Sequence, residues 1–198
     1  MWLQQVRPGG TITTPMLGWT GGAALAHLVV ADDGTAHGGF LPEPVYFMPA
    51  RPHAAPPLDT MEFGGGEESH TTTDPALLND ETGLLVAQLA APKAQRAWAG
   101  EILALHDVES GSHADVRPSQ PSGWEVHQYG PHRLWGRVER ALGTWLDAGR
   151  PHMSAFTFTV TPERQWVRLG ADSPIAWIRP HSRSRPVVCG GPVPLGRA

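Results

Sequence analysis

The sequence predicts an α+β protein, because one strong helical pattern stands among several short strand patterns separated by turn residues. The helical pattern occupies residues 131–148, and two alternating strand patterns, residues 156–161 and 165–169, follow it directly. A second group of strand patterns lies earlier in the chain, between residues 11 and 40. These observations favour a small antiparallel sheet with a helix packed on it, preceded by a separate group of strands.

The helix at residues 131–148 has clear start and stop signals. Pro131 suits the first helical position, where its missing N–H is not needed, while Gly149 and Pro151 end the helix. The apolar residues recur at helical spacing and define one face: Leu134, Trp135, Val138, Leu142, Trp145 and Leu146. This face is expected to pack on a sheet.

The strands of the expected sheet are bounded by turn residues. Phe156, Phe158 and Val160 alternate with threonines, and residues 162–164 form the turn into the next strand. The complete predicted sheet contains residues 101–107, 112–116, 124–129, 156–161 and 165–169.

Between the two strand groups the sequence changes character. Residues 52–73 contain three prolines, a glycine triplet and little apolar periodicity, so they are predicted to be a linker. Asp74 and Pro75 predict a short capped helix through Asn79. Residues 83–91 form an apolar run short enough for a buried strand, although the pattern also allows a helix.

Composition narrows the class of protein. The formal net charge of -4 gives no basic field for nucleic acid, and no apolar run reaches the roughly 18–20 residues that span a bilayer. The single cysteine, Cys189, excludes an internal disulfide framework and a cysteine-based zinc site within one chain. With no secretory signal pattern at the start, the expected location is the cytoplasm.

The opening residues resemble the end of a known catalytic domain. The turn Pro8-Gly9-Gly10 leads into a strand at residues 11–14, the pattern that precedes the fifth strand of class I S-adenosylmethionine-dependent methyltransferases. Strands at 23–30 and 36–40 and the segment EPVYFMP at residues 43–49 resemble the last hairpin and the closing E-x-V-x-F-x-P of isoaspartyl methyltransferases. Trp2, Leu3 and Val6 look like the end of a helix that begins upstream.

A second resemblance lies later in the chain. The pattern HQYGPHRLWGRVERALGTWLDAGRP, followed by FTFTVTPERQWVRL, resembles the carboxy-terminal extension of long actinobacterial proteins in the protein-L-isoaspartate O-methyltransferase family. Together the resemblances imply four segments. They are the carboxy-terminal strands of a Rossmann-like methyltransferase sheet (1–51), a linker (52–73), an α+β accessory domain (74–170) and a partly disordered tail (171–198).

The resemblance also implies a reaction, methyl transfer from S-adenosylmethionine to a carboxylate of a protein or ribosomal peptide. The cofactor-binding half of the family lies upstream of Met1, so this chain alone is expected to be inactive, and no catalytic, cofactor-binding or metal residue is predicted in it. The expected partners are the substrate and the missing amino-terminal half. A non-enzymatic peptide- or protein-binding module, or the remnant of a truncated gene, stays open as an alternative.

Several motifs contain residue types that could bind a cofactor or metal or act in catalysis, but each has a simpler structural explanation. Gly64-Gly65-Gly66 lacks the flanking strand and helix of a cofactor loop. His127 and His132 lack an evident third metal ligand, whereas catalytic zinc normally has three. The carboxylate–histidine set at residues 67–70 lies in the predicted linker, and the serines and histidine at residues 110–113 read as a turn.

Two further groups of residues are better explained by solvation or core packing than by a functional role. The basic residues of the tail are Arg179, His181, Arg183 and Arg185, and they are expected to be solvated. Trp124, Trp135, Trp145 and Trp166 are expected to fill the core, with an aromatic peptide groove as the alternative.

Overall fold

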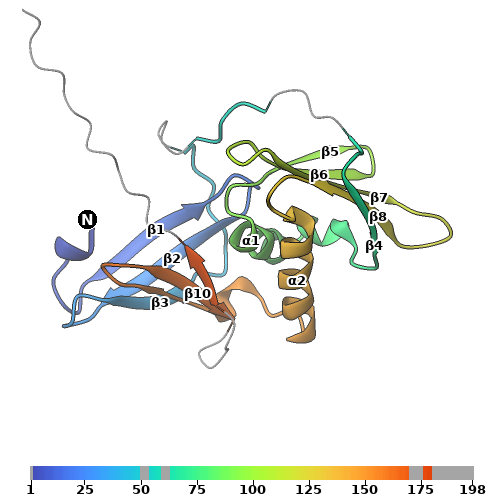
Figure 1. Ribbon diagram of the computed structural model, residues 1–198. Helices are drawn as coiled ribbons and strands as arrows, with labels where there is room; N and C mark the ends of the chain where they lie inside the picture. The colour runs from blue at the N-terminus through green and yellow to red at the C-terminus, as the bar shows by residue number, and fades with distance from the viewer. Residues whose placement is uncertain (1, 50–53, 59–62, 170–175, 180–198) are drawn as a thin grey trace, which may run out of the picture.

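A computed structural model describes residues 2–49, 54–58, 63–169 and 176–179 (Figure 1). The described chain forms two antiparallel sheets and two α-helices, which confirms the predicted α+β class. The predictions for the tail beyond residue 179 lie outside the described residues. None of the helices in the described ranges is long and apolar enough to cross a membrane.

The first sheet, sheet A, joins the beginning of the chain to its end. Its strand order is β1-β2-β3-β9-β10-β11, with every neighbouring pair antiparallel. The strands are β1 (Thr11–Leu17), β2 (Ala23–Val30), β3 (Ala36–Phe40), β9 (Phe156–Val160), β10 (Gln165–Leu169) and β11 (Ala176–Arg179).

Glycine permits a close approach of β2 and β3 in sheet A. Gly38 on β3 lies opposite Phe158 on β9, and a Cβ atom at Gly38 would stand 2.0 Å from the carbonyl oxygen of His27. Phe40 and Phe158 stack with ring centroids 5.8 Å apart. Any larger residue at position 38 would therefore force β2 and β3 apart.

The second sheet, sheet B, is formed by the middle of the chain. Its strand order is β4-β8-β7-β6-β5, again antiparallel throughout. The strands are β4 (Glu67–Thr71), β5 (Gln95–Ala99), β6 (Ile102–Asp107), β7 (Ser112–Pro118) and β8 (Trp124–Tyr129). The central strand β7 is buried from Ser112 to Val116, whereas β4 and β5 are the two edges.

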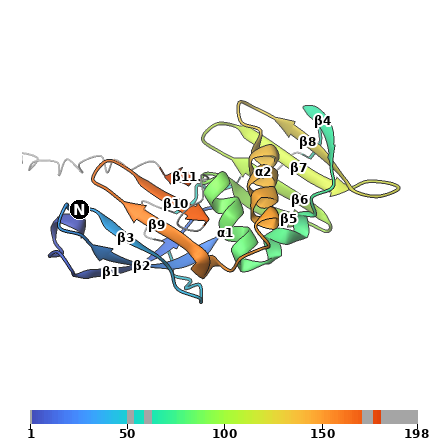
Figure 2. The same cartoon turned by 90° about the horizontal axis from the view of Figure 1, so that it is seen from below.

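The helices α1 (Glu81–Ala90) and α2 (Leu134–Asp147) lie between the sheets (Figure 2). The amphipathic α2 packs on β6, β7 and β8, while α1 contacts β2, β11 and α2. One continuous apolar core extends from sheet A through the helices to sheet B. Short 3-10 helices occur at Trp2–Gln4, Pro75–Asn79 and Met153–Ala155.

Capping residues set the helix boundaries. Asp74 accepts a hydrogen bond from the backbone N–H of Ala76 at 2.8 Å, which confirms the predicted short capped helix through Asn79. Asp80 caps α1 by accepting from the N–H of Gly83 at 2.9 Å. The helix at 131–148 is confirmed as α2, although it begins at Leu134.

Two sequence predictions were wrong, and one open choice is decided. The apolar run 83–91, for which the sequence allowed a strand or a helix, lies in helix α1 except for Ala91, which is its C-cap. This helix is buried on nearly every side and therefore lacks a polar stripe. The predicted linker 52–73 contains strand β4, whose polar sequence EESHT shows no apolar alternation. The strands 156–161 and 165–169 belong to sheet A, where β9 pairs with β3 and β10 pairs with β9 and β11, and not to sheet B, because a strand pattern does not identify its partner.

Two smaller differences concern short strands. Strand β5 (Gln95–Ala99) was not predicted, because its pattern QRAWA carries little alternation. The segment at residues 43–49 forms no strand, so the closing motif of the first predicted segment lies in irregular backbone.

Candidate functional site

The polar face of sheet B is the candidate functional site. Alternating residues of each strand point to opposite faces, so Val126, Val116 and Leu105 face the core and α2. Register places the intervening residues together on the side away from α2, which we call the outer face of sheet B. Its titratable residues are Glu68, His70, His106, His113, Asp115, Arg117, Glu125, His127 and Tyr129.

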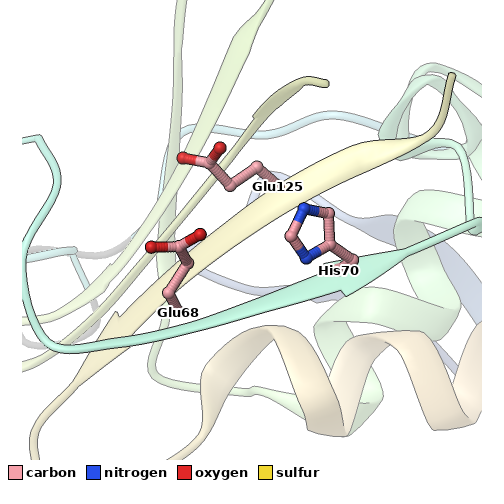
Figure 3. A group of neighbouring side chains, drawn as sticks. All are labelled: Glu68, His70 and Glu125. Atoms are coloured by element: carbon pink, nitrogen blue, oxygen red, sulfur yellow. The ribbon is translucent and has the colours of Figure 1, made fainter. Parts of the chain in front are cut away.

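At the β4 edge of this face, two strands bring together carboxylates and an imidazole (Figure 3). The register sets Glu68 opposite His127 and His70 opposite Glu125. One ligand atom from each of Glu68, His70 and Glu125 lies within 4.8 Å of the others. We call these three residues the edge cluster.

His127 supports the edge cluster from the same strand as Glu125. Its Nε2 atom hydrogen-bonds Oε1 of Glu125, and this bond is the main cause that lowers the pKa of the Glu125 carboxyl. The imidazole therefore orients a carboxylate that stays ionised at neutral pH.

A buried ion pair lies in the next strand, β7. The Asp115 side chain is fully buried and accepts hydrogen bonds from Arg117 Nε at 3.1 Å and from the backbone N–H of Gly64 at 2.8 Å. Gln95 on β5 also donates from Nε2 to the carbonyl of Pro56 at 2.9 Å. These two bonds attach the segments around Pro56 and Gly64 to the outer face, over β5 and β7. The edge cluster lies on β4 and β8, beyond these segments.

His113 is the buried imidazole of the outer face. Its ring stacks on Tyr129 with centroids 5.1 Å apart, and Nε2 lies 3.5 Å from Oδ1 of Asp115. Neither ring nitrogen makes a hydrogen bond. Burial lowers the pKa of His113; the Asp115 carboxylate opposes this effect and His106 adds to it.

The lowered pKa of His113 predicts a pH-dependent stability. The unfolded chain, with an ordinary histidine pKa of about 6.5, binds a proton that the folded chain excludes, so the free energy of unfolding falls as the pH drops below about 6.5. His113→Phe keeps the aromatic contact with Tyr129 and cannot be protonated. Urea unfolding at several pH values from neutral to mildly acidic should therefore show a shallower loss in His113→Phe than in the original chain; equal slopes would contradict the prediction.

The structure separates the two histidines that the sequence paired. His127 lies on the outer face of sheet B, whereas His132 precedes α2 and contacts Arg137 through Nδ1 at 3.1 Å. The set at residues 67–70 is split by strand alternation. Glu67 faces the helix side and pairs with Arg133, while Glu68 and His70 face outward.

The remaining motifs act as structure. Asp107 Oδ1 accepts from the backbone N–H groups of Glu109 and Ser110 in the turn at residues 108–111, so Ser110 and Gly111 lie in a turn as predicted, while Ser112 and His113 begin β7. Gly66 has positive φ and leads into strand β4, so the described glycine triplet opens a strand and not a helix.

The tryptophans divide between full and partial burial. Trp135 and Trp145 fill the core as predicted, while Trp124 and Trp166 are partly exposed. Arg179 ends β11, and His181, Arg183 and Arg185 lie outside the described residues.

The sequence could identify parts of the site but not their arrangement. Glu68, His70 and His127 were recognised in separate motifs, and only the pairing of β4 with β8 brings them together. Asp115 and His113 were missed as a buried pair, although the pattern HADVR alternates polar and small apolar residues. No family model, curated protein or solved structure matches this chain.

Proposed function

We propose that this chain is the carboxy-terminal part of a protein-L-isoaspartate O-methyltransferase-like protein. The proposal begins from the residues that resemble the family: the turn Pro8-Gly9-Gly10 before β1, the β2–β3 hairpin and the closing segment at residues 43–49. The reaction of the complete protein would transfer a methyl group from S-adenosylmethionine to a peptide carboxylate. The same proposal assigns β1–β3 to the carboxy-terminal end of a Rossmann-like catalytic sheet.

One observation carries the proposal furthest. Tyr46, Phe47 and Met48 lie in the closing segment and are 62%, 57% and 94% exposed. Three consecutive exposed apolar residues are unfavourable in water and typically mark a surface that another polypeptide covers. Strand β1 is in addition an edge of sheet A, with β2 as its paired neighbour. A catalytic half that docks here would cover both features.

The residues present in this chain decide which role the proposal gives to it and which to the other half. The described residues offer no cofactor loop, so the other half would bind S-adenosylmethionine. This chain would supply the docking surface around β1 and residues 43–49. Sheet B and α2 would then serve as an accessory unit that recognises the peptide or protein substrate.

A docking experiment tests this division. The chain is mixed with a separately expressed amino-terminal half of a related full-length methyltransferase, and the complex is measured by size-exclusion chromatography. We expect a complex that the combined change Tyr46→Ser, Phe47→Ser and Met48→Ser weakens by at least about tenfold, because most binding energy at an interface comes from a few buried apolar or aromatic residues.

The matched control is Phe63→Ser, which also removes an exposed aromatic side chain but lies outside the closing segment. Phe63→Ser should leave the complex intact. A complex that tolerates the triple change would contradict the docking surface. The absence of any complex would favour a non-enzymatic peptide-binding module, for which the edge strands β4 and β5 offer unpaired backbone to an extended peptide.

A further inference from the structure

We propose that the edge cluster, Glu68, His70 and Glu125, binds a divalent transition-metal ion of the Zn²⁺ class. The site is independent of the proposed methyltransferase role, because it lies in sheet B and requires no second polypeptide. Its ligand atoms come from two strands and already lie within 4.8 Å of one another (Figure 3). A metal ion between them would join the edge strand β4 to β8.

The type of donor atom indicates the class of metal. Two carboxylates and one imidazole offer oxygen and nitrogen, a combination that zinc and neighbouring transition metals accept. Mg²⁺ prefers oxygen ligands and water, so an imidazole in the set disfavours it. Three protein ligands leave a position for water, as in zinc sites that are open to solvent.

The charges around the edge cluster also favour a cation. The Glu68 and Glu125 carboxylates lie close together, and among the described residues neither forms an ion pair with lysine or arginine. Arg117 on β7 lies opposite Glu125 and favours its ionised form, but the hydrogen bonds of Arg117 go to the buried Asp115, and Arg133 pairs with Glu67 on the opposite face. A bound cation would offset the repulsion that remains between the two carboxylates.

His127 supplies the orienting contact that metal ligands commonly have. It hydrogen-bonds the Glu125 carboxylate and lies opposite Glu68 across the strand pair. Such outer partners fix the direction of a ligating group and raise metal affinity. The arrangement thus includes three direct ligands and one residue that positions a ligand.

Calorimetric titration of the full chain with ZnCl₂ tests the site. We expect binding that is lost in His70→Ala and weakened at least about tenfold in Glu68→Gln, since even the outer partners of a metal contribute a factor of about ten or more. MgCl₂ at the same concentrations should bind far more weakly. Hydrogen exchange should also slow in β4 when Zn²⁺ is added, because the ion would hold this edge strand to β8.

The control is Glu67→Gln, which makes the same chemical change one residue away on the opposite face. It should bind Zn²⁺ like the original chain. Glu68 and His70 are exposed, so their variants should keep the melting temperature of the metal-free protein. No Zn²⁺ binding, binding unchanged in His70→Ala and Glu68→Gln, or an equal loss in Glu67→Gln would each overturn the proposal.

Discussion

Replacing Trp145 by alanine should lower the free energy of unfolding by about 3–5 kcal/mol, the usual cost of removing a large aromatic side chain from a core. Trp145 is 1% exposed and lies on α2 where this helix meets α1. Its Nε1 atom donates to the carbonyl oxygen of Pro151 at 2.9 Å. The change would leave a cavity between the helices and remove one of the hydrogen bonds that hold the chain after α2.

The close approach at Gly83 makes this cavity costly. A Cβ atom at Gly83 would lie 3.3 Å from the Trp145 ring and 2.2 Å from the carbonyl oxygen of Leu77, so the backbone of α1 is already tightly packed there. Urea unfolding measures the effect, with Trp98→Ala as the control, because Trp98 is partly exposed on the edge strand β5. A loss no larger than that of Trp98→Ala would contradict the position of Trp145 in the core.

Replacing Asp115 by alanine should cost about 3 kcal/mol, near the lower end of the range for breaking a buried ion pair. The carboxylate is fully buried, and its removal leaves the N–H of Gly64 without its acceptor. The Arg117 side chain is 30% exposed, so water can partly hydrate the charge that loses its partner. This partial hydration keeps the expected cost below that of a fully buried pair.

The same unfolding measurement tests Asp115, with Asp32→Ala as the matched control. Asp32 lies in the exposed turn between β2 and β3, so its removal should change stability little. Hydrogen exchange at Gly64 should also become faster in Asp115→Ala, because the segment before β4 loses its attachment to β7. Equal stability of the two variants would show that the buried pair contributes little.

Local signals in the sequence predicted the elements whose burial differs between two faces. The apolar stripe from Leu134 to Leu146 predicted α2, and alternation predicted β9 because Phe156 and Phe158 are buried while Thr157 and Thr159 are less so. These patterns arise when one face meets the core and the other meets water. The capping prediction at Asp74 was correct for another local reason, because its side-chain oxygen accepts from an N–H of the first helical turn.

Elements whose two faces have similar surroundings could not be predicted from periodicity. Helix α1 is surrounded by sheet A and α2, so its apolar run resembled a buried strand. Strand β4 is an edge with Glu68 and His70 on one face and Glu67 on the other, so its sequence resembled a loop. In both cases the environment beyond the segment, and not its own periodicity, decides the structure.

Strand partners were the least predictable feature, and the candidate site depends on them. The pairing of β3 with β9 joins parts of the chain that are far apart, and the sequence of either strand fits several neighbours. The edge cluster needs β4 and β8 in one register, since a shift by one residue would turn Glu125 to the opposite face. The sequence therefore contained the ligands of the cluster without its geometry.

Titration with S-adenosylhomocysteine tests the central claim most directly, namely that this chain completes a methyltransferase whose cofactor site lies in another polypeptide segment. Calorimetry is performed on the chain alone, on the amino-terminal half of a related full-length protein alone, and on their mixture. We expect no heat of binding from the chain alone and the strongest binding from the mixture. Binding by the chain alone would contradict the account, and a mixture that binds no better than the amino-terminal half would contradict the proposed complementation.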